Sequence, residues 1–202
     1  MKFWKKLWGA SQPAQTGGVE VEPGHLHASQ ETEAHFLAFV ELLTVCVAED
    51  EAQRILRVAR AAWRARAAKD TAAGSFAQVD ACQVLEEVMA GEDGQRPGQW
   101  LVIHLDWKAT EEVGWQVADI LAQRKLQPTW AGIDEEFDTV PAAFMDLAQW
   151  LQQRGLALLD IETDADAFCA FIVDDAQVAR ARQLAQAARL TLYDAEEFAA
   201  RN

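Results

Sequence analysis

The spacing of hydrophobic residues changes once along this chain, at a break around residues 91–98 that contains three Gly and a Pro. Before the break, apolar side chains recur every three or four residues, a spacing that predicts helices. The first predicted helix starts after Ser29, its expected N-cap. Two more are expected: one opens with Glu49, Asp50 and Glu51 and has its body over 52–68, and the other covers about 79–90. Apolar positions of the first helix include Phe36, Phe39, Val40, Leu43 and Val47.

After the break, short apolar runs alternate with amphipathic segments. The predicted elements are strand 100–106, helix 110–125, strand 129–133, helix 140–153, strand 156–163, strand 167–173, helix 176–188, strand 190–194 and a terminal helical turn. A tight connection between two successive strands predicts an antiparallel hairpin. The sequence therefore predicts an α+β fold, with a mixed sheet in β-α-β-α-β-β-α-β order preceded by a helical N-terminal part.

These patterns divide the chain into three regions. Residues 1–28 are expected to form a flexible N-terminal tail, because residues 10–28 are rich in Pro, Gly and polar residues without a period. Residues 29–92 form a helical segment, and residues 99–202 form an α/β domain.

Composition indicates a folded cytoplasmic protein. Half of the 202 residues are apolar, which is enough for a hydrophobic core. The chain contains no apolar run of about 18 residues, so no transmembrane segment is expected. Its basic start is followed by no apolar stretch, so no secretory signal is expected. The three cysteines lie far apart and indicate reduced thiols.

The formal net charge of −14 disfavours nucleic acid as a partner and favours a basic protein. One segment departs from this balance, because residues 54–69 carry six Lys or Arg and no acid. Four arginines share one face of the predicted helix there: Arg54, Arg57, Arg60 and Arg64. This face has two interpretations, contact with nucleic acid or anionic lipid, and a solvated face that pairs with the acidic remainder of the protein.

Residues 1–9 combine aromatic and basic side chains at helical spacing. The segment is either a peripheral membrane or partner contact, or a frayed start to the chain.

Charged side chains gather where strand 100–106 meets the following helix. Asp106, Trp107, Lys108, Glu111 and Glu112 lie at this junction, the edge where α/β proteins usually bind ligands. Tryptophan beside carboxylates is typical of protein-binding surfaces. Core packing is the alternative for each tryptophan here. We expect Trp115 in the core and leave Trp107 open between the two.

A second acidic group lies at the end of strand 156–163. Asp160 and Glu162 share a strand face and, together with Asp106, could hold a hard cation if strands 100–106 and 156–163 were adjacent. The alternative is a polar strand face. Counted from Asp160, the segment does not match an EF-hand loop, because Ala165 and Phe171 stand where Gly and Glu are needed. No metal site is assigned.

Three stretches carry a resemblance to a known family: DWKATEE (106–112), GLALLDIETDADAF (155–168) and LTLYD (190–194). Over about residues 99–194 the chain resembles an uncharacterised bacterial family of soluble α/β domains with no assigned activity. The resemblance implies the boundary near residue 99 and a bacterial origin, and it supplies no catalytic residue.

The sequence lacks a nucleophile elbow, a phosphate-binding loop and a C-x-x-C motif, so no catalytic residue and no cofactor is predicted. The first hypothesis is a non-enzymatic, immunity- or adaptor-like domain that binds a basic protein. The alternative is a divalent-metal-dependent hydrolase that uses the strand-end carboxylates Asp106, Glu111 and Asp160. The oligomeric state is left open.

Overall fold

The computed structural model describes residues 23–72, 79–127, 129–163 and 166–201. The predicted contact of residues 1–9 lies outside this part of the chain. The longer elements are helices α1 (Pro23–Leu43), α2 (Glu49–Ala72), α3 (Ala81–Ala90), α4 (Glu111–Gln123), α5 (Val140–Gln152), α6 (Val178–Ala187) and α7 (Ala195–Ala199), and strands β1 (Val102–Asp106), β2 (Leu156–Ile161), β3 (Ala167–Asp174) and β4 (Leu192–Asp194). Short 3₁₀ helices cover Thr44–Cys46 (η1), Ala131–Asp134 (η2) and Asp175–Gln177 (η3).

The sheet confirms the α+β fold class and corrects one part of the prediction. Its strand order is β1-β3-β2-β4, and every pairing is antiparallel. The sheet was expected to be mixed, with both parallel and antiparallel strand pairs. It is not, because the hairpin return strand β3 inserts between β1 and β2 and keeps these two same-direction strands apart.

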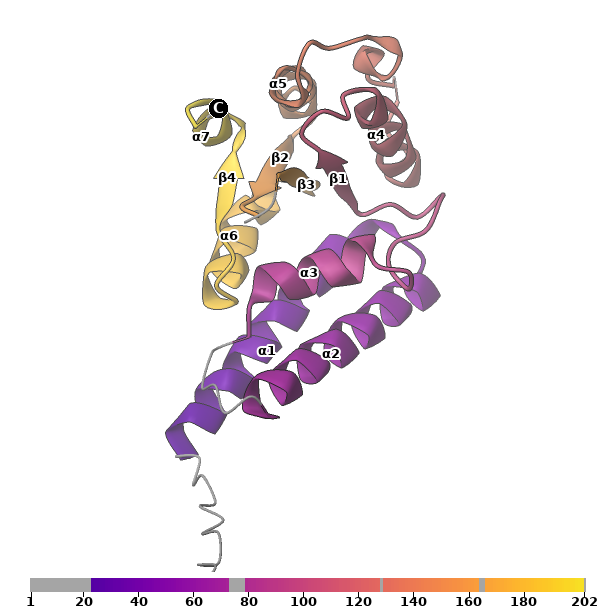
Figure 1. Cartoon of the computed structure of the whole chain (residues 1–202). Coiled ribbons are helices and arrows are strands. Elements are labelled where there is room, and N and C mark those ends of the chain that lie inside the picture. Colours follow the sequence, from indigo (N-terminus) through magenta and orange to yellow (C-terminus); the bar gives the residue numbers. More distant parts are fainter. Residues whose placement is uncertain (1–22, 73–78, 128, 164–165, 202) are drawn as a thin grey trace, which may run out of the picture.

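Helices cover both faces of the sheet, as Figure 1 shows. On one face, α1, α2, α3 and α6 share a hydrophobic cluster with alternate residues of the strands. On the other face, α4, α5 and α7 pack on a second cluster. In the first cluster, Phe39 of α1 meets Phe171 of β3 edge to face, with ring centroids 5.5 Å apart. The N-terminal helices therefore bury their apolar faces against the sheet. The division into regions 29–92 and 99–202 stays a prediction.

Two local predictions were wrong. Helix α1 begins at Pro23, where a proline suits the first turn, so Ser29 lies within the helix and is not its N-cap. The segment 129–133, predicted as a strand, instead forms part of the 3₁₀ helix η2 (Ala131–Asp134). Trp130 is buried there and donates its indole N–H to Asp146 at 2.7 Å. A Cβ at Gly132 would lie 2.2 Å from the Trp130 ring, so the close turn around this ring requires glycine.

Other helix ends follow the sequence signals. Thr139 caps α5 by accepting the N–H of Ala142 at 3.2 Å. Gly155 follows the end of α5 with a φ of 69°, a conformation that favours glycine. Asp80 caps α3 through the N–H groups of Cys82 and Gln83.

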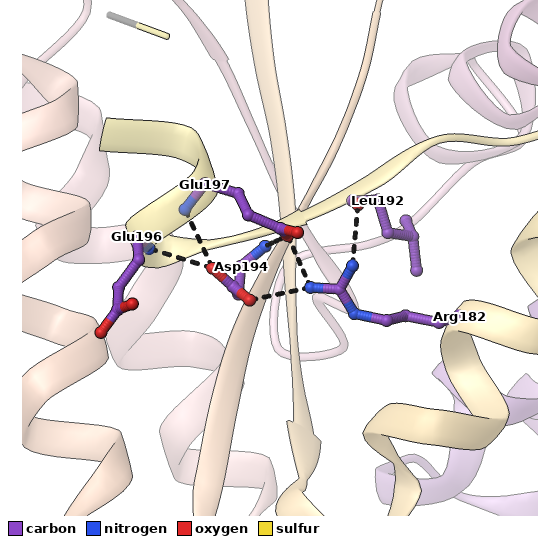
Figure 2. Close-up of polar contacts among 5 residues, drawn as sticks. All are labelled: Arg182, Leu192, Asp194, Glu196 and Glu197. Carbon is purple, nitrogen blue, oxygen red and sulfur yellow. Dashed lines mark hydrogen bonds and ion pairs between the residues drawn. The ribbon is translucent and has the colours of Figure 1, made fainter. Parts of the chain in front are cut away.

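The C-terminal helix is held by the polar network of Figure 2. Asp194 caps α7 by accepting the N–H groups of Glu196 and Glu197, and Glu197 accepts the N–H of Asp194 in return. Arg182 of α6 bonds both carboxylates, at 2.9 Å to Asp194 and 2.6 Å to Glu197. This capping box positions Phe198, whose side chain is buried against the α5 side of the sheet.

Replacing Asp194 by Ala should lower the free energy of unfolding by about 0.5–2 kcal/mol, because it removes the cap of α7 and one partner of Arg182. Urea unfolding measures the difference. Glu196→Ala is the matched control, since the Glu196 side chain points away from the network in Figure 2. Equal destabilisation by the two variants would contradict the role of the cap.

Candidate binding surface at the β1–α4 junction

The turn between β1 and α4 is fixed by backbone hydrogen bonds. Asp106 ends β1, and its carboxylate accepts the N–H of Lys108 at 3.0 Å. Its carbonyl accepts the N–H of Ala109 at 3.0 Å. Trp107 donates its N–H to the carbonyl of Asp166 beside β3, at 3.3 Å. The side chains at this turn are therefore presented from a rigid backbone.

Acidic side chains open helix α4. Glu111 and Glu112 occupy its first turn and are exposed. Negative charge is favourable at this position, because the helix dipole places partial positive charge at its N-terminus. With Asp106, the two glutamates give the junction an acidic surface.

Side chains close the outer edge of β1. Gln116 of α4 is 1% exposed; it accepts the N–H of His104 at 2.8 Å and donates to the carbonyl of His104 at 3.0 Å. Gln95 bonds the N–H and carbonyl of Val102 in the same manner, at 3.0 and 2.8 Å. These amides replace a neighbouring strand, and they leave less of this edge free to pair with another chain.

Two tryptophans are exposed at the junction. Trp107 is 52% exposed, and the Lys108 ammonium lies 4.5 Å from its ring centroid. Trp115 is 47% exposed, so its predicted place in the core was wrong. The apolar face of α4 that meets the sheet is formed by other residues, and Trp115 packs edge to face on Trp100 at 4.9 Å. We call Asp106, Trp107, Lys108, Glu111, Glu112 and Trp115 the β1–α4 surface.

The structure does not bring all predicted site residues together. Asp160 and Glu162 belong to the end of β2, and β3 separates that strand from β1. The adjacency required for a cation held jointly by Asp106 and Asp160 is therefore absent. Within the described ranges, no three His, Cys, Asp or Glu side chains gather as a metal-binding group. The hydrolase hypothesis thus loses its proposed ligand set.

Asp160 lies inside the fold. It is 8% exposed and points to the sheet face that α5 and α7 cover, the face of Leu158 two positions earlier. One of its carboxylate oxygens, Oδ1, has no hydrogen-bond partner. Burial raises the pKa of Asp160 to about 7, and the Arg201 guanidinium opposes this shift.

Glu162 belongs to a network that the sequence did not indicate. Tyr193 donates its hydroxyl to Glu162 at 2.9 Å, and Arg201 donates to the other carboxylate oxygen at 2.7 Å. These two hydrogen bonds hold the pKa of Glu162 below its usual value. Arg201 also stacks over the Tyr193 ring at 4.0 Å. The partners lie 31 and 39 residues from Glu162, so no local spacing could have indicated them.

The contacts of two α2 arginines favour the interpretation in which this face pairs with the rest of the protein. Arg54 bonds Glu51 at 2.7 Å and the carbonyls of Asp93 and Gly94 at 2.5 and 2.7 Å, so it holds the 91–98 loop. Arg64 lies 3.3 Å from Glu33. Arg57 and Arg60 are exposed.

Of the described helices, none is long and apolar enough to span a bilayer.

Comparison with known proteins places most of the chain in one family. No curated protein and no solved structure matches the chain. A family model, the domain of unknown function DUF6630, matches residues 35–195. The match begins inside α1, so it includes the N-terminal helices that the sequence resemblance over about 99–194 left out. The chain belongs to the DUF6630 family of domains of unknown function.

Proposed function

We propose that the β1–α4 surface binds a basic segment of another protein. The observation that carries this proposal is the exposure of Trp107 and Trp115, at 52% and 47%, beside the acidic first turn of α4. Tryptophan is enriched among the residues that dominate binding energy at protein interfaces.

The chemistry of the surface suits lysine and arginine side chains. Carboxylates of Asp106, Glu111 and Glu112 can pair with their charges, and the tryptophan rings can accept them through cation–π contacts. Lys108 already lies over Trp107 in this manner. The net charge of −14 adds a long-range attraction that raises the association rate of a basic partner.

The scaffold supports binding without a large rearrangement. Backbone hydrogen bonds fix the turn at Asp106 and Trp107, and Gln116 ties α4 to β1. A surface that is already ordered loses less conformational entropy on association. A non-enzymatic, adaptor- or immunity-like role, in which the domain acts by occupying a basic partner, is the function this surface supports best.

Neutralising Glu111 and Glu112 together as Gln should slow association with the partner about 3- to 10-fold at low salt and change dissociation little. The partner is first recovered on the immobilised full chain from source cells, then purified for surface plasmon resonance at several salt concentrations. The control is Glu135→Gln with Glu136→Gln, an exposed acidic pair outside the junction. Equal association rates for both double variants would count against the proposed surface.

A further inference from the structure

A small cavity lies at the other end of β1 from the β1–α4 surface. Its volume is about 250 Å³. Val173 and Asp174 of β3 line it, and they lie beyond the Val102 end of β1, whereas Asp106 pairs with Ala167. The end of α1, η1, the residue after α4 and the start of α6 complete the walls. This cavity is therefore separate from the proposed protein-binding surface.

One wall of the cavity is apolar. Leu42 and Val173 are buried, while Val45 at the rim is 73% exposed, the highest value among the large hydrophobic residues that the structure describes. The turn η1 holds Val45 in this position, because Thr44 donates its hydroxyl to the carbonyl of Glu41 at 2.8 Å. An apolar group placed in the cavity would cover Val45 and remove it from water.

Two arginines line the cavity. The Arg124 side chain is 12% exposed; it donates to the carbonyl of Ile172 and lies 3.8 Å from Asp174. Its Nε is enclosed and has no hydrogen-bond partner. This enclosed nitrogen is not open to the cavity, so a ligand would meet the Arg124 guanidinium through its charge and its terminal nitrogens. Arg180 of α6 is exposed at the same cavity.

Two carboxylates line the cavity as well. Glu41 at the end of α1 is exposed, and the Asp174 side chain is 58% exposed. Two cations and two anions around one small space do not suit a simple anion, because the carboxylates would repel it. They suit a ligand that carries both charges, with its carboxylate toward the arginines and its ammonium toward Glu41 or Asp174.

We propose that this cavity binds a small zwitterion with an apolar side chain, of the α-amino acid class. The apolar side chain would contact Leu42, Val45 and Val173, and the two charged groups would meet the opposite charges of the cavity. The volume supports a ligand of this size, because pockets for drug-sized molecules measure about 300–1,000 Å³.

The test measures the thermal unfolding midpoint and calorimetric binding of the full chain with L-leucine, L-valine and L-phenylalanine. Two analogues of leucine isolate the charges: 4-methylpentanoate lacks the ammonium group, and 3-methylbutylamine lacks the carboxylate. A ligand bound only by the folded state raises the midpoint. We expect at least one amino acid to raise it, and both analogues of leucine to bind more weakly than leucine by about tenfold or more.

Variants link the binding to this cavity. Arg180→Gln and Glu41→Gln each remove one exposed charge and should weaken amino acid binding about tenfold. Arg60→Gln on α2 is the control and should leave it unchanged. No midpoint shift with any of the three amino acids would overturn the proposal. Equal binding of leucine and 4-methylpentanoate, or unchanged binding in both cavity variants, would also overturn it.

Discussion

Replacing Asp160 by Asn should stabilise the protein at pH 8 by about 2–4 kcal/mol. The reason is the pKa of Asp160, which burial raises from 3.8 to about 7 in the folded chain. Between these values the folded state keeps a proton that the unfolded state has lost. Because the unfolded state binds fewer protons there, stability falls as pH rises from about 4 to 7, by up to about 1.4 kcal/mol per pH unit. Asn keeps the shape of the side chain and cannot ionise.

Urea unfolding of wild type and Asp160→Asn at pH 5 and pH 8 measures this effect. The wild type should lose stability across this range through Asp160, and the variant should lose less. Asp138→Asn removes an exposed carboxylate and serves as the control. If Asp160→Asn were no more stable than wild type at pH 8, ionisation of the buried carboxylate would not destabilise the fold as expected.

The second large effect concerns the closed edge of β1. Replacing Gln116 by Leu should lower the free energy of unfolding by about 2–4 kcal/mol, because the N–H and the carbonyl of His104 lose their partners at a site where Gln116 is 1% exposed. The freed edge should also pair with other chains, since an open strand edge is a template for association.

Thermal unfolding and light scattering report the two parts of this prediction. Gln149→Leu, an exposed glutamine on α5, is the matched control for added apolar surface. A Gln116→Leu variant within about 0.5 kcal/mol of this control, and equally monodisperse, would show that the amide does not protect the edge.

Local signals in the sequence predicted local structure well. The predicted hairpin depends on a few neighbouring residues, and the structure confirms it as β2–β3; the Thr139 cap and the glycine after α5 are equally local features. The segment at 129–133 failed because its conformation follows from Trp130, whose partner Asp146 lies 16 residues away. The strand order could not be predicted, and the expected mixed sheet was wrong, because the insertion of β3 between β1 and β2 depends on long-range contacts.

The candidate site also has a part that local sequence predicts and a part that depends on long-range packing. Asp106 through Glu112 are consecutive along the chain, so their common surface could be predicted from a strand followed by a helix. Trp115 was misplaced although its position was informative: at 100° per residue it lies nearly opposite the buried face of Val113, Val117, Ile120 and Leu121, so the helical spacing itself indicated exposure. For Asp160 the sequence left open a cation ligand or a polar strand face, whereas the structure buries it on the sheet face that α5 and α7 cover.

The most direct test of the proposed function is the dissociation constant of the recovered partner for wild type and for a Trp107→Ser, Trp115→Ser double variant. Both side chains are about half exposed, so the fold should survive, and Val45→Ser controls for loss of an exposed apolar group elsewhere. We predict that the dissociation constant rises about 30-fold or more in the double variant and stays unchanged in the control, as for residues that dominate binding. Unchanged binding by a folded double variant would contradict the proposal.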